Sequence, residues 1–358
     1  MAHKSADNHP RRVLVTRFSA LGDVAMTIPV LYSVALCNPA TQFIFVTRAS
    51  MTGMFVNPPA NLTVKGIDLN DPDYKGLTGI NRLYRRLRDE YDFDAVADLH
   101  DVLRTQVLDL RARLGGIRVA RINKGRSHKR RLTRQTNKVM LPLTSQRARY
   151  REVFFRLGLV VESRFNSLYP DGRGPEQLFA GITEPKAEGE KWIGIAPFAK
   201  HKGKIYPIAL MEKVVEHFSQ MPHVKIFLFG GGKEEAEVLG AWADRYPHTV
   251  SLASKRHGFA VELSLLSHLD VMVSMDSANM HLASLVRTPV VSIWGATHPY
   301  CGFKGWRQDD NDLVQLSMTC RPCSVFGDKP CHRGDYHCLA GIAPQIIIDK
   351  VTAHLSHD

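Results

Sequence analysis

The chain has 358 residues, which is longer than one hydrophobic core usually extends and therefore predicts two domains. Its composition, with 44% hydrophobic and 23% charged residues, is that of a globular protein, and no apolar run reaches the roughly 18 residues of a membrane-spanning helix. The net charge of +12 favours anionic partners: nucleic acid, phosphorylated lipid or nucleotide. Residues 1–12 are polar and lack the apolar segment of a secretory signal, so we expect a cytoplasmic protein.

Strands and helices alternate through the first half of the chain. Short β-branched and apolar runs predict strands at 13–16, 43–46, 95–97 and 117–119. Helical spacing predicts helices at 77–90 and 103–114, and an apolar helical pattern runs from 24 to 37 with Pro29 as an interior break. This alternation is typical of a parallel sheet with helices on both faces.

A segment rich in Gly, Pro, Glu and Asp, residues 169–190, predicts an inter-domain linker. The alternation then resumes, with strands predicted at 192–196, 224–229, 250–253, 271–274 and 290–294 and helices at 208–219, 233–246, 278–286 and 342–355. The predicted fold class is therefore α/β, with two doubly wound Rossmann-like domains that face a central cleft. Ligands of such sheets bind beyond the carboxyl ends of the strands.

The loop that follows the first predicted strand of each domain is suited to an anion. In the first domain, residues 17–24 end a strand and open a helix, Gly22 allows a tight turn, and Asp23 stands at the cleft-facing end of the strand. Asp23 has the alternative role of a helix N-cap. In the second domain, residues 196–207 carry three lysines and a histidine around a glycine, which suits phosphate binding, although a flexible basic loop is the alternative. The spacing of a Walker A loop is absent.

Two further strand ends carry small or polar residues. Gly230, Gly231 and Gly232 follow a strand and either permit close approach of a ligand or only make a tight turn. The turn at 274–283 joins a strand to a helix that Asp276 or Ser277 can cap, and it contains His281, for which a buried structural role is the alternative. Residues 295–299 form a second polar loop that we expect beside this turn.

Basic residues concentrate between 121 and 138, where eight Lys or Arg occur without any Asp or Glu. We interpret this stretch as a phosphate-binding surface, with a solvated surface loop as the alternative.

Four of the six cysteines stand close together near the C-terminus: Cys320, Cys323, Cys331 and Cys338. Their spacing contains one C-x2-C pair, which suits zinc, and one looser pair. A structural zinc site and free thiols or reversible disulfides both remain open. Structural disulfides are disfavoured in the cytoplasm.

Three segments together resemble one known family. RFSALGDVAMTIPVL, the AKHKGKIYP loop and MDSANMHLASLVRTPVVSIWGATHP are similar to the ADP-heptose:lipopolysaccharide heptosyltransferases, glycosyltransferase family 9, over roughly residues 12–351. The resemblance implies the GT-B fold, an acceptor-binding Rossmann-like domain at 1–175, a nucleotide-sugar-binding domain at 176–340 and a closing helix at 341–358.

The resemblance also implies an inverting, metal-independent transfer of a heptose or related sugar from an ADP-sugar to a lipopolysaccharide core or lipid A acceptor. Asp23 matches the general base, Lys204 the lysine that holds the donor phosphates, and Asp276 an acidic residue near the donor sugar. The other implied donor-binding residues are Ala199, Lys200, Gly230, Gly231, Ser277, Ala278, Asn279 and His281. The expected acceptor-binding residues are Ser19, Lys124, Arg126, Lys129, Arg130, Arg131 and Arg134.

The expected partners are the nucleotide-sugar donor, an acidic glycolipid acceptor and an anionic membrane surface, with the protein peripheral on the inner face of the inner membrane. No cofactor is expected beyond the donor substrate, apart from the open question of structural zinc. One rival interpretation is a nucleotide-sugar epimerase of the same fold, which would consume no acceptor. Another is an RNA-binding protein, but no aromatic residue interrupts the basic stretch to stack on bases, so we expect no nucleic acid partner. A Rossmann dehydrogenase is disfavoured because no G-x-G-x-x-G follows a strand.

Overall fold

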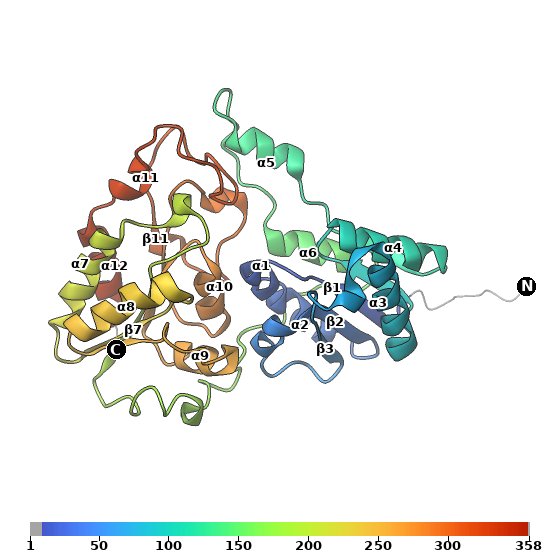
Figure 1. Cartoon of the computed structure of the whole chain (residues 1–358), viewed down its shortest axis with the longest axis horizontal. Coiled ribbons are helices and arrows are strands. Elements are labelled where there is room, and N and C mark those ends of the chain that lie inside the picture. The colour runs from blue at the N-terminus through green and yellow to red at the C-terminus, as the bar shows by residue number, and fades with distance from the viewer. Residues whose placement is uncertain (1–8, 357–358) are drawn as a thin grey trace, which may run out of the picture. The chain divides into compact units, whose positions relative to one another are not determined.

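The computed structural model describes residues 9–356, so the polar residues 1–8 at the N-terminus lie outside the described part. Packing divides the described residues into two units (Figure 1). The first unit comprises the residues up to Lys124 together with Thr144–Asn166, and the second comprises Gly125–Leu143 and the residues from Ser167 onward. The basic stretch is therefore shared: Arg121 and Lys124 belong to the first unit and its other cations to the second.

The first unit is built on a parallel sheet of five strands in the order β3-β2-β1-β4-β5. Its strands are β1 (Arg12–Thr16), β2 (Gln42–Arg48), β3 (Leu62–Ile67), β4 (Ala95–Asp98) and β5 (Arg118–Arg121). Because the chain runs outward from β1 in one direction and then returns to β4 on its other side, the strand order reverses between β1 and β4. The carboxyl ends of the strands at such a switch point are where ligands of doubly wound sheets bind.

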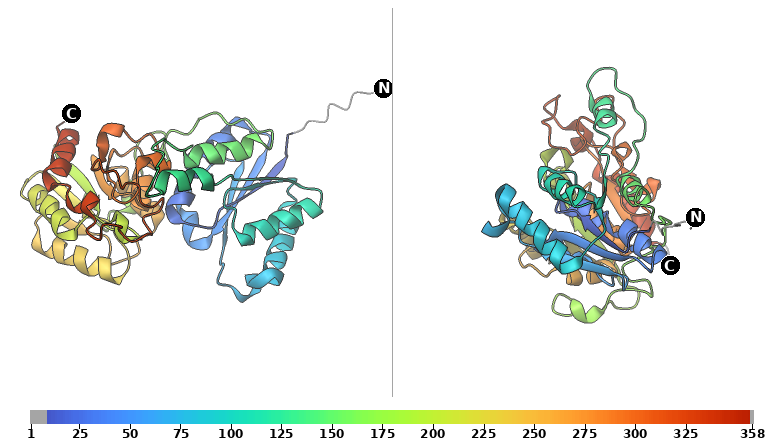
Figure 2. Two further views of the ribbon diagram at one scale, coloured as in Figure 1. Left: turned by 90° about the horizontal axis from the view of Figure 1, so that it is seen from above. Right: turned by 90° about the vertical axis from the view of Figure 1, so that its right-hand side faces the viewer.

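Helices cover both faces of this sheet (Figure 2). They are α1 (Leu21–Ala25), α2 (Ile28–Cys37), α3 (Gly76–Tyr91), α4 (Leu103–Leu114) and α6 (Gln146–Phe155). Leu83 of α3 and Leu108 of α4 share one core cluster with Leu14 of β1. On the opposite face Phe154 of α6 packs edge-on against Phe43 of β2, with ring centroids 6.3 Å apart. The alternation of Phe43 and Ile44 between the two faces follows from the two-residue period of a strand.

The helical pattern predicted over 24–37 is interrupted, as the proline indicates, but the interruption lies before Pro29 and not at it. The structure has two helices, α1 and α2, and Pro29 stands in the first turn of α2 rather than inside a continuous helix. A proline is well tolerated there, because the N–H that it lacks would have no helical partner in the first turn.

The second unit contains a parallel sheet of six strands in the order β11-β10-β9-β6-β7-β8. Its strands are β6 (Lys191–Ala196), β7 (Val224–Leu228), β8 (Thr249–Ser251), β9 (Val271–Met275), β10 (Val290–Ile293) and β11 (Leu313–Val314). The strand order reverses between β6 and β9, so the loops after these two strands occupy the second switch point.

The helices of the second unit are α5 (Arg126–Thr133), α7 (Ile208–Ser219), α8 (Lys233–Arg245), α9 (Phe259–Leu266), α10 (Ala278–Leu285), α11 (His337–Ala340) and α12 (Pro344–Leu355). Val214 of α7 and Ile348 of α12 enclose the main core with Ile193 and Ile195 of β6. Trp192, the neighbour of Ile193 on β6, faces the other side and packs on Phe179 and Phe227.

The segment 169–190, which the sequence predicts as a linker, packs on the second unit. Gly174 donates its N–H to Ser267 Oγ at 2.7 Å, and Ser264 Oγ donates to the carbonyl of Pro175 at 2.7 Å. Phe179 lies in the cluster around Trp192. The glycines and prolines of the segment 169–190 therefore shape a surface loop that is anchored to α9. Among the residues from 9 to 356, no helix is both long and apolar enough to cross a membrane.

Candidate functional site

In the first unit, Asp23 lies in the loop-and-helix segment that follows β1. It occupies the third position of α1, and its Oδ2 accepts the N–H of Ala20 at 3.4 Å. The side chain of Asp23 is 20% exposed. Asp23 is therefore not the N-cap residue, which is Ala20. Its contact with the N–H of Ala20 uses only one carboxylate oxygen and leaves the side chain in contact with solvent.

Arg17 holds the same carboxylate oxygen. Its Nη2 lies 2.6 Å from Asp23 Oδ2, and its Nη1 donates to the carbonyl of Leu99 at 2.6 Å. The guanidinium is buried and lies 5.9 Å from the ring centre of Tyr150, whose hydroxyl donates to the backbone carbonyl of Asp23 at 3.2 Å. The loops after β1 and β4 and the helix α6 together fix Asp23.

His100, in the loop after β4, orients the predicted acceptor residue Ser19. The N–H of Phe18 donates to His100 Nδ1 at 3.4 Å, which places the ring proton on Nε2. Nε2 lies 3.2 Å from Ser19 Oγ and donates to it. Burial and the nearby charges of Arg17 and Lys124 lower the pKa of His100 to about 3, so the ring is neutral at pH 7. The hydroxyl proton of Ser19 is consequently directed to an acceptor other than His100.

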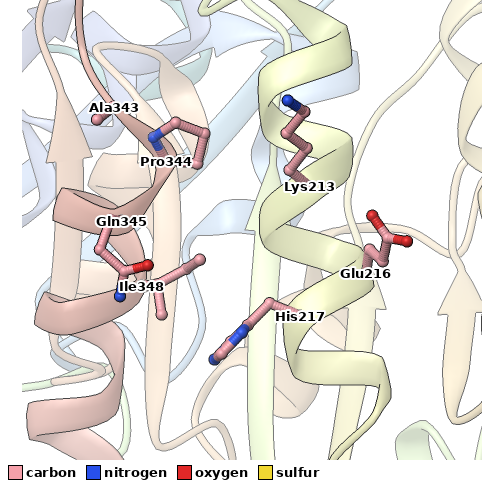
Figure 3. A pocket seen from close by; sticks show the side chains of 7 residues that line it. All are labelled: Lys213, Glu216, His217, Ala343, Pro344, Gln345 and Ile348. Carbon is pink, nitrogen blue, oxygen red and sulfur yellow. The ribbon is translucent and has the colours of Figure 1, made fainter.

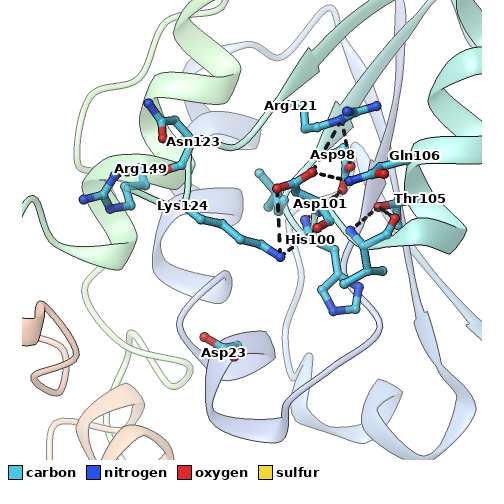
Figure 4. Close-up of polar contacts among 12 residues, drawn as sticks. Asp23, Asp98, His100, Asp101, Thr105, Gln106, Arg121, Asn123, Lys124 and Arg149 are labelled. Atoms are coloured by element: carbon cyan, nitrogen blue, oxygen red, sulfur yellow. Dashed lines mark hydrogen bonds and ion pairs between the residues drawn. The ribbon is translucent and has the colours of Figure 1, made fainter. Parts of the chain in front are cut away.

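A network of carboxylates supports this loop (Figure 4). Asp98 is fully buried and its Oδ1 accepts the N–H groups of His100 and Asp101 at 2.8 and 2.9 Å. Arg121 Nε lies 2.7 Å from Asp109 Oδ2 and 3.6 Å from Asp98 Oδ2. Burial raises the pKa of Asp109 to about 7, the charge of Asp98 adds to the rise, and Arg121 opposes it.

Lys124 belongs to the same network. Its Nζ donates to the backbone carbonyl of Asp101 at 2.7 Å and lies 4.0 Å from Asp101 Oδ2. Lys124, one of the cations predicted to bind the acceptor, is thus tied to the loop after β4 (Figure 4).

In the second unit, Lys204 and Asp276 come together at the switch point between β6 and β9. Lys204 Nζ lies 2.9 Å from Asp276 Oδ2 and also donates to the backbone carbonyl of Asp276 at 2.9 Å. Thr297 Oγ1 donates to the same Oδ2 at 2.8 Å. Asp276 is only 4% exposed and precedes Ser277, the N-cap residue of α10, so its carboxylate acts inside the fold.

Ser277 occupies the N-cap position of α10, but its side chain makes no capping hydrogen bond and instead lies 3.3 Å from Ser274 Oγ. Ala278 and Asn279 form the first turn of α10 and are partly exposed, so the backbone N–H groups at this positive helix end lie near the surface. His281 is buried one turn later in the same helix. The structure therefore brings Ser277, Ala278 and Asn279 to the switch point beside Asp276.

The remaining predicted donor residues lie on neighbouring loops of the second unit. Ala199 packs on the core cluster and Lys200 is exposed, both in the loop after β6. Gly230 and Gly231 follow β7, where the N–H of Gly231 donates to Glu235 Oε2 at 2.8 Å. A Cβ at Gly230 would lie 2.7 Å from Leu239 Cδ1, so this glycine has a packing reason of its own.

Arg321 shapes the loop after β10 from inside the protein. It is 2% exposed, and it donates to the carbonyls of Gly295, Trp294 and Thr297 at 2.5, 3.1 and 2.9 Å. The neighbouring Cys323 N–H donates to the carbonyl of Ala296 at 2.9 Å. Arg321 thereby fixes the loop that delivers Thr297 to Asp276.

The predicted basic surface is largely the helix α5 and the segment after it. Arg126, Arg130, Arg131 and Arg134 are exposed. Lys129 Nζ lies 5.3 and 5.5 Å from the ring centres of Phe303 and Phe326. Met140, Leu141 and Phe326 are 43%, 64% and 48% exposed, so this side of the second unit presents both cations and apolar side chains.

Cys320, Cys323, Cys331 and Cys338 line one cavity of about 10 Å³. All four are free thiols, and burial raises the pKa of Cys338 to about 11. Within residues 9–356, no three His, Cys, Asp or Glu side chains are arranged to hold one metal ion. The structure therefore brings the four cysteines together as free thiols and adds no support for zinc.

A pocket of about 480 Å³ lies between α7 and α12 (Figure 3). Lys213, His217, Gln345 and Ile348 are among its lining residues. None of the predicted site residues lines it, and it is formed by helix side chains rather than by strand ends, so we assign it no part in the site.

The sequence alone did not indicate Arg17, His100, Thr297 or Arg321 as site residues. The sequence does offer a pattern that indicates His100, because Asp98 ends a buried strand and His100 and Asp101 follow it closely. Thr297 likewise lies in a polar loop just past β10. Arg17 lies in the singled-out segment 17–24, but its contact with Leu99 gave no local signal, and neither did the contacts of Arg321 with the loop after β10.

Known proteins are similar to this chain in sequence and in fold. Lipooligosaccharide heptosyltransferase 2 of Campylobacter jejuni is 24% identical over 168 residues, which are 46% of this chain and 51% of that protein. The chain thus matches about half the length of such curated relatives.

Two solved structures are similar over nearly the whole chain. The glycosyl transferase family 9 structure from Veillonella parvula has a TM-score of 0.71 at 15% identity, covering 96% of this chain and 97% of that one. The E. coli heptosyltransferase WaaC with ADP has a TM-score of 0.62 at 16% identity, covering 88% and 96%. These likenesses concern the fold and confirm the predicted GT-B class. The model of glycosyltransferase family 9 (heptosyltransferase) matches residues 80–330, and the chain belongs to this family.

Proposed function

We propose that this protein is an inverting glycosyltransferase that transfers a heptose from an ADP-activated donor to an acceptor of the lipopolysaccharide core. One observation carries the proposal: each unit gathers polar groups at its own switch point, and the two sets suit different halves of the reaction. The first unit offers a solvent-accessible carboxylate, Asp23, and an oriented hydroxyl, Ser19. The second offers a lysine and a helix N-terminus, which suit a diphosphate.

The donor step is assigned to the second unit. Two of the three N–H groups of Lys204 face Asp276, which leaves one for a phosphate oxygen. The N–H groups at the start of α10, with Ser277 and Asn279, are the proposed partners of the other phosphate oxygens. The E. coli heptosyltransferase WaaC, which is similar in fold, has been solved with ADP, and this supports an adenine nucleotide as the leaving group.

The acceptor step is assigned to the first unit. The acceptor hydroxyl oxygen forms a bond to the anomeric carbon while the bond from that carbon to the diphosphate oxygen breaks. The electron pair of the broken bond leaves on ADP, and the hydroxyl proton passes to Asp23. A single displacement inverts the configuration. Lys204 and α10 stabilise the negative charge that grows on ADP, and no metal ion is required for this.

The acceptor is proposed to be an acidic glycolipid at an anionic membrane surface. The exposed arginines of α5 suit phosphate or carboxylate groups, and the exposed Met140 and Leu141 suit the apolar boundary of a bilayer. Peripheral contact of this kind would place the enzyme on the inner face of the membrane where such acceptors are assembled.

The proposal is tested by incubating the purified protein with ADP-heptose and a lipopolysaccharide core acceptor that lacks terminal heptose. We expect release of ADP and an acceptor whose mass increases by one heptose, both dependent on the acceptor. Matched UDP-sugars serve as the control and should not react. ADP-heptose consumption without any acceptor product would contradict the transferase and favour the epimerase-like alternative.

A further inference from the structure

Arg17 directly follows β1 and is buried, and its contacts lie in the first unit. The side chain is 7% exposed, and one end of the guanidinium is fixed by the carbonyl of Leu99 at 2.6 Å. Leu99 follows β4, the strand that pairs with β1 across the switch point. The guanidinium position is therefore set by the sheet itself.

The Asp23 carboxylate uses its two oxygens differently. Oδ2 contacts Arg17 Nη2 at 2.6 Å and the N–H of Ala20 at 3.4 Å. Oδ1 accepts no hydrogen bond from any of the residues 9–356, and the side chain is one-fifth exposed. The backbone carbonyl of Asp23 is held as well, by the hydroxyl of Tyr150 at 3.2 Å.

We propose that Arg17 is a positioning residue that fixes Asp23 through Oδ2, so that Oδ1 is the atom that takes the proton of the acceptor hydroxyl. This inference rests on the proposed function and adds a second residue to it. Without Arg17 the carboxylate rotates about its side-chain bonds, and only a fraction of its orientations direct an oxygen at the acceptor. Displacements of about 1 Å in such sites cost up to 10²-fold in rate.

A lysine can replace only part of this arrangement. Its single ammonium can pair with Asp23 Oδ2, but it lacks the planar fork with which Arg17 reaches Asp23 and Leu99 at once. The conservative variant should therefore restore part of the effect, which a residue needed only to fill space would not do.

The test is a double-variant cycle on the transfer reaction, with Arg17→Met, Arg17→Lys, Asp23→Asn and the pair Arg17→Met/Asp23→Asn. We expect Arg17→Met to lower kcat by roughly 10- to 100-fold with the KM for the donor within about twofold. Arg17→Lys should recover part of that loss, and Arg17→Met should have no further effect once Asp23 is Asn. Arg12→Met is the matched control, because Arg12 begins β1, the strand that Arg17 directly follows, and pairs with Asp92 at the surface.

Affinity for ADP, measured by calorimetry, shows whether each variant retains a folded donor site, since the partners of Arg17 belong to the first unit and the donor is assigned to the second. If the losses from Arg17→Met and Asp23→Asn multiply, or if Arg17→Met raises only the KM for the acceptor, the positioning role is overturned while the transferase stands. Failure of the wild-type protein to transfer any sugar would overturn both.

Discussion

Each unit pairs a carboxylate with a cation where parallel strands end, yet the two pairs differ in burial and in their remaining partners. Arg17 is the buried member of the first pair, and the carboxylate of Asp23 keeps one oxygen and one-fifth of its surface for other molecules. In the second pair the carboxylate of Asp276 is the buried member, bound by Lys204 and Thr297. A buried carboxylate bound by a lysine and a threonine stabilises a loop, whereas an anchored but accessible one can accept a proton. The first pair therefore suits the proposed proton transfer, whereas in the second pair the buried carboxylate fixes a loop and orients the lysine that we propose to bind the donor.

The largest effect is expected at Asp23. Replacing Asp23 with Asn keeps the size of the side chain but removes the proton acceptor, and we expect turnover to fall by roughly 10² to 10⁴. ADP affinity should stay unchanged because the donor is assigned to the second unit. Steady-state kinetics and calorimetry on the same preparation measure the two quantities. An Asn variant with wild-type turnover would remove Asp23 from the mechanism.

The second prediction separates the contribution of Lys204 to stability from its proposed contribution to donor binding. Lys204→Met leaves Asp276 buried with Thr297 as its remaining side-chain partner, and the loss of one member of a buried pair costs about 3 to 5 kcal/mol of unfolding free energy. Adding Asp276→Asn should recover most of that stability without restoring donor affinity. Lys202→Met, at an exposed lysine two residues away, is the control. Urea denaturation of the wild type and the three variants gives the free energies of unfolding. A Lys204→Met protein as stable as wild type would show that the pair contributes little to stability.

A third test uses Asp109, a buried carboxyl in the first unit whose partner Arg121 does not offset the effect of burial on its pKa. Its folded pKa of about 7 is raised above the ordinary value near 3.8, so the folded state binds this proton more tightly than the unfolded state. Stability from this group is therefore greatest below about pH 4, falls as the pH rises from about 4 to 7, and is constant above that range.

Asp109→Asn removes the titration, because an amide resembles the protonated acid. The melting temperature of the variant relative to wild type should rise steadily between pH 4 and 7. Asp73→Asn, at an exposed carboxylate paired with Arg82, should show no such trend. A difference between Asp109→Asn and wild type that does not change with pH would contradict the raised pKa.

The smallest effect on the fold is expected at the exposed arginines of α5. Arg130→Gln and Arg131→Gln should leave the melting temperature unchanged, because both side chains are exposed. Each removed cation should weaken binding to vesicles with anionic lipid by about fivefold, equivalent to about 1 kcal/mol. Sedimentation with vesicles at increasing salt measures this binding. If vesicle binding changes neither with salt concentration nor with the substitutions, the membrane contact is not electrostatic.

Local sequence patterns predicted most of the regular elements. The helix predicted at 208–219 coincides with α7, and the strands predicted at 192–196 and 224–229 differ from β6 and β7 by one residue. Missed elements include β3 and α6. In β3, Thr63 and Lys65 interrupt the apolar pattern, and α6 mixes arginines with aromatic residues so that no apolar stripe stands out.

The sequence predicted only part of the candidate site. Asp23, Lys204, Asp276 and Ser277 were named from segments that resemble a family, and the structure places the last three at one switch point of the second unit. Their proposed roles in the reaction stay predictions.

The sequence by itself determined the alternation of strands and helices and the concentration of cations, because each of these depends on residues a few positions apart. Only the tertiary structure decided which strands are neighbours, and with them the contacts of Arg17 with Leu99, Ser19 with His100, and Arg321 with the loop after β10. Arg17 and Leu99 are 82 positions apart in the chain. They meet because β4 pairs with β1, and that pairing is set by how the whole sheet buries its apolar faces rather than by any local pattern.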